Sequence, residues 1–377
     1  LRVVRVQNSS VSNATESGSA FVIKNTTDYT NSYADGSASV GLWAARTAGA
    51  WGNNLKIESC PSATAYEETS KTTVNDASTA VGDTVVTVTS GTGISVGDIV
   101  NFGDQYEYRV VNVATNDLTI VRKEEPQYFV ASNSSGLQAD LTNGAAVRRR
   151  WRYYELFDKA PGTSPYAEAR AGVNDEIHIV VVDEDGGISG TKGDVLETYD
   201  AVSKGSDAKT PQGDTNYYPD VIFRQSSFVF WLDHPSVLTN AGTARTAGQS
   251  YATGNGTTGE ITFSLGGGTD DYAVTAGELK TAYDRFADTE SLDVNLILGG
   301  RGGGSGDSSS LQDTHVTMLT NFVETRKDCV AFVSPFRSAT VAVNSHLTQT
   351  DNVINAFDQC PSSSYVVFDS GYKYMYD

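Results

Sequence analysis

The stretch of this 377-residue chain that most constrains its fold is residues 274–304, VTAGELKTAYDRFADTESLDVNLILGGRGGG. Its first part places apolar residues at i, i+4 and i+7, which gives a helix one face to bury. These residues are Leu279, Tyr283 and Phe286. Thr275 and Glu278 have the spacing of a capping box at the start of that helix. Residues 294–298 are nearly all apolar, which is typical of a strand covered on both faces.

The same alternation of helix and strand continues to the end of the chain, and it predicts an α/β unit with a mixed sheet and packed helices. The expected strands are residues 260–264, 293–298, 329–333 and 365–368, and the expected helices are residues 275–287, 310–326 and 348–358. The opening segment, residues 1–6 (LRVVRV), reads as a strand without a partner nearby. We expect it to join this C-terminal sheet.

A second pattern, between residues 67 and 145, consists of short alternating strands, expected over residues 84–89, 99–102, 106–113 and 118–122 and separated by Gly-Asp and Asn-Asp turns. This spacing predicts a small antiparallel β-barrel or sandwich, inserted into a loop of a β-rich middle domain, in which residues 176–183 are a further expected strand. The expected fold class is therefore α+β and multidomain. The expected domains are residues 1–6 plus 259–377 (inner α/β domain), 7–66 plus 146–258 (middle domain) and 67–145 (inserted outer β module).

The formal net charge is −19 and the sequence pI is about 4.5, whereas a nucleic-acid binder normally carries the opposite sign. One basic run interleaves arginines with aromatic residues: Arg148, Arg149, Arg150, Trp151, Arg152, Tyr153 and Tyr154. The run could form a phosphate patch with stacking aromatics. We favour an alternating strand over residues 151–157 with solvated arginines outside. No apolar run approaches the ~20 residues of a membrane helix. We expect neither a nucleic-acid partner nor membrane insertion.

The residue types that bind metals lack the necessary spacing. Three cysteines, Cys60, Cys329 and Cys360, are too few and too far apart for a disulfide framework or a zinc site. The four histidines, at positions 178, 234, 315 and 346, show no His-x-x-x-His spacing. The acidic stretch 183–187 lacks the spaced ligands of a calcium loop and is typical of a hairpin turn. We expect no metal and no cofactor.

The candidates for catalysis are equally incomplete. The loop Gly299–Gly306 follows a strand and precedes a helix, as a phosphate-binding loop does, but it has neither a closing Lys-Ser/Thr pair nor a Gly-x-Gly-x-x-Gly register. Arg301 could meet a phosphate, although a flexible connection is the favoured interpretation. Ser334 precedes Pro335 and lacks a nucleophile elbow, and Cys329 begins a buried strand, where thiols are usually inert. We expect no catalytic residues and no enzymatic activity.

Several segments, taken together and in order, resemble the contractile tail sheath proteins of T-even-type bacteriophages, the myophage tail sheath family. The segments are residues 1–6, 44–57 (AARTAGAWGNNLKI), 274–300, 328–337 (DCVAFVSPFR), 351–357 (DNVINAF) and 371–377 (GYKYMYD). The resemblance is good over residues 272–377, 1–6 and 44–57, poor or absent over 67–145, and only patterned between 151 and 259. It implies a fragment without the N-terminal arm and the C-terminal assembly domain of the family.

The resemblance implies a mechanical function. Subunits of the family stack as hexameric rings around a tail tube and contract, which drives the tube through the host envelope. The implied partners are further copies of the chain, the tail tube protein, and the baseplate and tail terminator proteins. The implied location is the virion tail, after assembly in the bacterial cytoplasm. The inserted module would lie outermost, where an extra domain is easily accommodated.

Two other functions stay open from the sequence. The first is a carbohydrate-binding adhesin or surface protein, since β modules and the aromatic residues around Trp151 suit glycan binding. The second is an α/β enzyme that acts on a phosphorylated substrate at the Gly299–Gly306 loop. Glycan binding by the module, or a thermal shift with nucleotides that depends on Arg301, would distinguish them.

Overall fold

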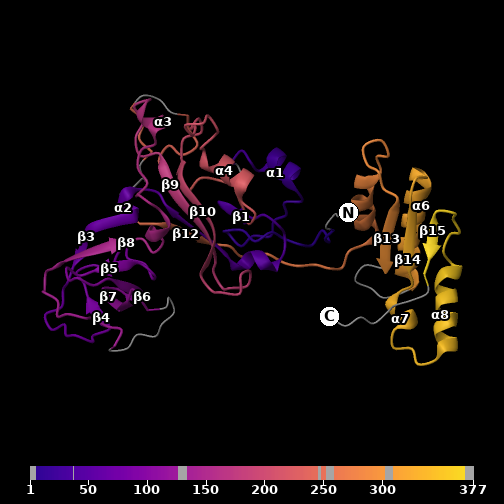
Figure 1. Cartoon of the computed structure of the whole chain (residues 1–377), viewed down its shortest axis with the longest axis horizontal. Coiled ribbons are helices and arrows are strands. Elements are labelled where there is room, and N and C mark those ends of the chain that lie inside the picture. The colour runs from indigo at the N-terminus through magenta and orange to yellow at the C-terminus, as the bar shows by residue number, and fades with distance from the viewer. Residues whose placement is uncertain are drawn as a thin grey trace. The chain divides into compact units, whose positions relative to one another are not determined.

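The chain folds into two units, shown in a computed structural model that describes residues 6–36, 38–125, 134–244, 248–251, 259–301 and 309–369 (Figure 1). We call Ser12–Gly268 the central unit, and Leu1–Val11 with Thr269–Asp377 the C-terminal unit. The fold is mixed α+β with several antiparallel sheets and helices, which confirms the expected class at that level. The three predicted domains stay a prediction. The opening strand and the 371–377 segment lie almost wholly outside the described residues.

A four-stranded antiparallel sheet, the central sheet, organises the central unit. Its order is β10-β9-β2-β12, with β2 Leu55–Cys60, β9 Glu176–Asp183, β10 Asp194–Ser203 and β12 Ile261–Ser264. All eight residues of β9 are buried, as expected for an inner strand with neighbours on both sides. We had expected residues 260–264 to belong to the C-terminal α/β unit. That assignment is wrong, because β12 pairs antiparallel with β2.

Short elements complete the central unit around this sheet. Strands β1 and β11 form a two-stranded antiparallel sheet in which Trp43 lies opposite Trp231. These strands and the helices are β1 Trp43–Ala45, β11 Val229–Trp231, α1 Thr26–Ser32, η1 Ala50–Asn54, α2 Ala63–Tyr66, η2 Tyr154–Leu156, α3 Pro165–Glu168 and α4 Tyr218–Gln225. Helix α4 places Val221 and Ile222 in the core of the central sheet, beside Ile177 and Ile179.

In the sequence, the strands of a six-stranded antiparallel sheet lie between α2 and η2, and we call this sheet the β module. Its order is β3-β8-β5-β6-β7-β4, with β3 Glu67–Thr73, β4 Val85–Thr87, β5 Ile99–Asn101, β6 Tyr108–Ala114, β7 Asp117–Arg122 and β8 Ala146–Arg150. Four of the six strands were predicted from their alternation. Glu67 lies opposite Arg150, so the chain enters and leaves the module at paired residues. Over the described residues the sheet is no closed barrel, because its edge strands β3 and β4 form no ladder with each other; only an isolated bridge between Val74 and Val88 joins the residues that follow them.

The C-terminal unit contains a three-stranded parallel sheet of order β13-β14-β15. Its elements are α5 Ala276–Tyr283, η4 Asp284–Phe286, β13 Leu296–Arg301, α6 Ser309–Arg326, β14 Val330–Ser334, α7 Arg337–Thr340, α8 His346–Asp358 and β15 Val366–Phe368. The predicted capping box of α5 is confirmed, with Thr275 and Glu278 satisfying each other's backbone amides. The described sheet is purely parallel, whereas a mixed sheet was expected.

The order of these strands explains why the helices cover one face of the sheet. Each step from β13 to β14 to β15 moves in the same direction, and right-handed crossovers then place both connections on one side. Helix α6 packs Val316 and Leu319 against Ile297 and Ala331. Helix α8 follows on the same side, where the rings of Phe357 and Phe368 lie 4.5 Å apart. The opposite face of the sheet has no helix layer within the described chain.

Two expectations fail at particular residues. The strand after α5 is not covered on both faces, because the side chains of Leu296 and Leu298 are 62% and 78% exposed. Residues 151–157 do not form a strand. The chain leaves β8 at Trp151, turns, and forms η2, and the Trp151 ring stacks on Phe157 with centroids 5.7 Å apart.

Candidate functional site: the arginine strand of the β module

The glycine-rich segment has a packing role at its first residue. A Cβ on Gly299 would lie 2.6 Å from Cδ1 of Leu319, so a side chain there would push α6 away from β13. The Gly299 carbonyl oxygen also lies 3.1 Å from Nε2 of His315. Residues 302–306 of the predicted loop lie outside the described residues, and Arg301 is described only as the end of β13.

His178 and His234 are hydrogen-bonded to neighbours that make no catalytic set. Nδ1 of His178 accepts from the Ala201 amide at 3.0 Å, so Nε2 carries the proton toward the Lys159 carbonyl oxygen at 2.9 Å. Burial lowers the pKa of His178, which favours this neutral form. Burial likewise lowers the pKa of His234, to about 4, between the hydroxyls of Tyr217 and Tyr218. Among the described residues, no group of three or more His, Cys, Asp or Glu could hold a metal ion.

The remaining chemical candidates, Asp183 and Ser334, are hydrogen-bonded within the protein. The Asp183 carboxylate accepts from the amides of Gly186, Ile188 and Ser189, which closes the hairpin between β9 and β10 as predicted. These amides outweigh burial and lower the pKa of Asp183. Ser334 donates to the Asp369 carboxylate at 2.6 Å, whereas a serine nucleophile typically donates to a histidine.

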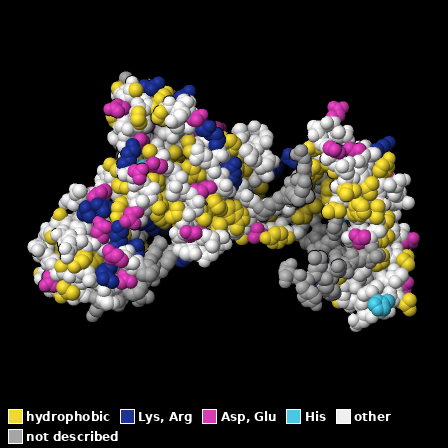
Figure 2. Space-filling view, viewed as in Figure 1, with side chains coloured by type: hydrophobic (Ala, Val, Ile, Leu, Met, Phe, Trp, Pro, Cys, Tyr) yellow, Lys and Arg dark blue, Asp and Glu magenta, His cyan; other side chains and the backbone are white. Residues whose placement is uncertain are grey.

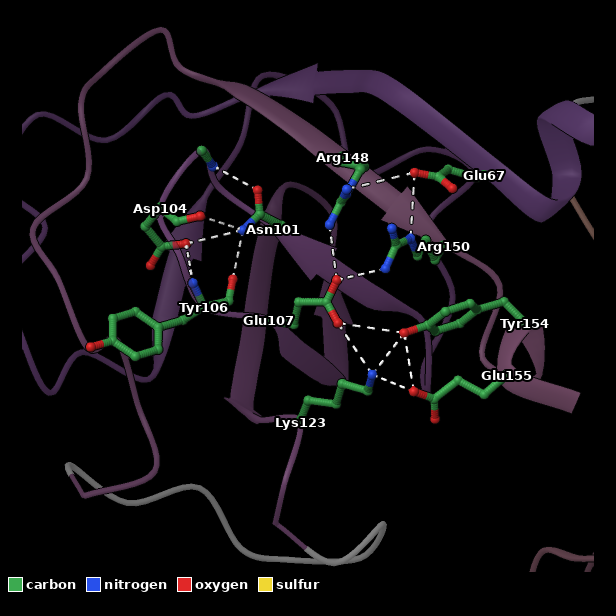
Figure 3. Close-up of polar contacts among 11 residues, drawn as sticks. Glu67, Asn101, Asp104, Tyr106, Glu107, Lys123, Arg148, Arg150, Tyr154 and Glu155 are labelled. Carbon is green, nitrogen blue, oxygen red and sulfur yellow. Dashed lines mark hydrogen bonds and ion pairs between the residues drawn. The ribbon is translucent and has the colours of Figure 1, made fainter. Parts of the chain in front are cut away.

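The arginine run itself forms the strand β8, and its residues alternate between two faces. Figure 3 shows the outer face, where the guanidinium groups of Arg148 and Arg150 both meet Oε1 of Glu107, at 2.9 and 2.8 Å. Glu67 lies beside the same arginines, with one carboxylate oxygen 3.7 Å from Arg148 and 3.4 Å from Arg150. One carboxylate on β3 and one before β6 therefore bridge two cations of β8.

The same network extends to the turn that follows β8. Lys123 reaches the other oxygen of Glu107 at 3.2 Å and the Tyr154 hydroxyl at 2.7 Å, and it pairs with Glu155 (Figure 3). The network thus contains three cations and three carboxylates: Arg148, Arg150 and Lys123 with Glu67, Glu107 and Glu155. Basic and acidic side chains also lie side by side on the visible surface of the module (Figure 2). The positive charge of this part of the run is therefore balanced within the molecule.

Arg149 points to the other face of β8, and its side chain is fully buried. We expected solvated arginines here, which is wrong for this residue. Its guanidinium donates to both oxygens of Asp98, at 2.8 and 3.2 Å, and to the Ala65 carbonyl oxygen at 2.6 Å. It also pairs with Glu260, which directly precedes β12. We call Arg149, Asp98 and Glu260 the buried triad. It joins the β module to the central sheet.

The triad holds more negative than positive charge in a buried place. Burial, together with the charge of Glu260, raises the pKa of Asp98 to about 6, although Arg149 acts against the shift. A second buried carboxylate, Glu58 of β2, lies 3.1 Å from Arg152 and 3.2 Å from Lys56. Arg152 follows the last strand of the module, so a second ion pair also joins module and central sheet. This arrangement can fix the module mechanically.

Sequence reasoning predicted a strand over residues 151–157, whereas the strand that forms is Ala146–Arg150, and it missed the buried arginine of that strand. The available signal was the period of two in β8. Val147, Arg149 and Trp151 are two residues apart, and all three are fully buried. The partners Asp98 and Glu260 are 51 and 111 residues away from Arg149, too far for a local pattern to reveal.

The fold and the site define an α+β protein whose densest charged clusters hold its own parts together. No protein-family model matches the chain. Over 136 aligned residues it is 34% identical to the tail sheath protein of Enterobacteria phage T4, which is 32% of this chain and 19% of that protein. The similarity thus spans about a third of the chain and about a fifth of the relative. No helix in the described ranges has the length and apolarity needed to cross a membrane.

Proposed function

We propose that the chain is a structural subunit of a contractile phage tail sheath. The observation that carries the proposal is the similarity to the T4 tail sheath protein, over about a third of the chain. The described architecture suits such a part. Its charged clusters are closed within the subunit, the hydrogen bonds of His178, His234 and Ser334 suit structural roles, and Cys329 is buried.

In this proposal, copies of the chain stack as hexameric rings around a tail tube, and the stack contracts to drive the tube through the host envelope. The energy would be held in subunit packing, since two packings of one sequence can differ by a few kcal/mol. The partners would be other copies, the tube protein, and the baseplate and terminator proteins. The chain would act without a cofactor and without catalysis, in the virion tail.

The proposal is tested on whole virus particles. Antibodies against the β module, used with gold labelling in electron microscopy, should decorate the tail along its whole length at a regular axial repeat. Label confined to fibre tips, or to the capsid, would contradict the proposal. Such labelling would favour a carbohydrate-binding adhesin, and a glycan-binding assay with the same chain would test that alternative.

A further inference from the structure

The C-terminal sheet has one apolar face that its own helices leave uncovered. On this face, which we call the bare face, the register places Leu296 beside Val330 and Leu298 beside Phe332, and Phe332 in turn lies beside Val367. Leu296, Leu298 and Val367 are 62%, 78% and 42% exposed. Parallel sheets are normally covered on both faces, and a contiguous exposed apolar patch of this kind marks an interaction surface.

The same unit carries a second apolar surface on the outer side of α8. Leu347 and Ile354 are seven residues apart, which places them on one face of the helix, and they are 80% and 58% exposed. The inner side of this helix contributes Ala356 and Phe357 to the contacts with the sheet and α6. Because α8 lies on the covered side of the sheet, this outer stripe and the bare face look in opposite directions.

The charges beside the two surfaces are complementary. On α8, Asp351 and Asp358 each follow an exposed apolar residue of the stripe by four positions, and both are exposed. Lys327 and Arg337, three residues before and three residues after β14, the central strand of the bare face, are exposed. Within the described residues none of these four groups makes an ion pair with another described residue. Because the chain has a net charge of −19, these exposed cations are distinctive sites at which acidic residues of another copy can dock.

We propose that the bare face is the docking site for α8 of a second copy of this chain. The neighbour's Leu347 and Ile354 pack on Leu298 and Phe332, and the sheet gains the second helix layer that parallel sheets normally have. The two surfaces differ, so the contact is head-to-tail, and repeated contacts of this kind generate rings or open stacks. The inference rests on the proposed function only for the identity of the partner, because that function requires contacts between copies.

Single-cysteine variants of the full chain test this contact. Leu298→Cys and Ile354→Cys are each made in a Cys360→Ser background, since Cys60 and Cys329 are buried. A short bismaleimide is added to each variant and to their mixture over a concentration series. The mixture should give about tenfold more cross-linked dimer than either variant alone, because in a head-to-tail contact each position meets only the other one.

The control pairs Leu298→Cys with Val81→Cys, an exposed apolar residue of the β module that is 64% exposed. This mixture should cross-link no more than the single variants do. Equal yields in the control, cross-linking of Leu298→Cys with itself, or no dimer at any soluble concentration would overturn the proposal. Protection of Leu298→Cys from maleimide that is independent of concentration would do the same, since it would show that the chain covers the face itself.

Substitutions to aspartate give a second reading that does not depend on cross-linking geometry. Leu298→Asp and Ile354→Asp should each weaken self-association at least about tenfold in sedimentation experiments, since each buries a charge in the contact. Val81→Asp should leave it unchanged. If antibodies label the tail but the aspartate variants associate normally, the docking site is wrong and the proposed function stands. If the variants lose self-association but the tail is not labelled, the proposed function is wrong and the contact between copies stands.

Discussion

The β module and the C-terminal sheet solve the same packing problem in different ways. The antiparallel sheet of the module curls around its own core, in which Val86, Val100 and Ile120 are fully buried. The parallel sheet depends on its connecting helices, and the order β13-β14-β15 sends both to one face. The module buries its apolar core within its own sheet, whereas the C-terminal sheet leaves apolar residues of one face exposed. We therefore expect the C-terminal sheet, rather than the core of the module, to make the contact between copies proposed above.

The largest expected effect concerns the base of the module. Arg149→Leu leaves Asp98 and Glu260 buried without their cation, which should cost about 3–5 kcal/mol of stability. Hydrogen exchange of amides in β5 and β8 would report the loss locally. The matched variant Arg148→Leu, on the outer face of the same strand, should cost no more than about 1 kcal/mol. Equal costs for both arginines would mean that the triad is no stronger than a surface pair.

Neighbouring residues of β13 compare the two faces of the C-terminal sheet. Ile297 is 7% exposed and Leu298 is 78% exposed. Ile297→Ala should destabilise the unit by about 2–5 kcal/mol, because it leaves a cavity against α6. Leu298→Ala should change stability by less than about 0.5 kcal/mol in dilute solution. Urea unfolding at low protein concentration measures both, and a large loss at Leu298 would show that the face is covered within one chain.

The buried triad should give the module a dependence on pH. The pKa of Asp98 in the folded chain, about 6, lies above its ordinary value of 3.8, so folding favours the protonated acid. Its contribution to stability therefore increases as the pH falls from about 7 to about 4, by on the order of 1–3 kcal/mol. In Asp98→Asn this dependence should be absent. The measurement is the unfolding free energy of the parent protein minus that of Asp98→Asn, followed with pH. We expect this difference to become more positive on acidification, and a change in the opposite direction would contradict the prediction.

The smallest expected effect is on the outer face of β8. Glu107→Gln removes the charge that bridges Arg148 and Arg150, in a network that is partly exposed to solvent. We expect a loss of about 0–1 kcal/mol that diminishes with added salt. Thermal unfolding at low and high ionic strength would measure it. A loss as large as that of Arg149→Leu would reverse the contrast between the two faces of the strand.

Local patterns predicted those elements whose stability is local. The apolar run of β9 gave residues 176–183 to the residue, and the Thr275–Glu278 box gave the start of α5. Strand β3, with the sequence EETSKTT, was missed because it has no apolar alternation and is held by pairing with β8. The burial of Arg149 depends on partners far away in the sequence. The exposure of Leu298 depends on the order of strands, which hydrophobicity alone does not encode.

The pairing of Glu67 with Arg150 has a consequence for how such chains diversify. Paired residues in an antiparallel ladder have Cα atoms about 4.5–5.5 Å apart, so the whole six-stranded insert hangs from two adjacent points of its host. One inserted module can then be exchanged for another if the first and last strands of the replacement also pair with each other. Related proteins could in this way change the inserted module without a change in the sheet that carries it.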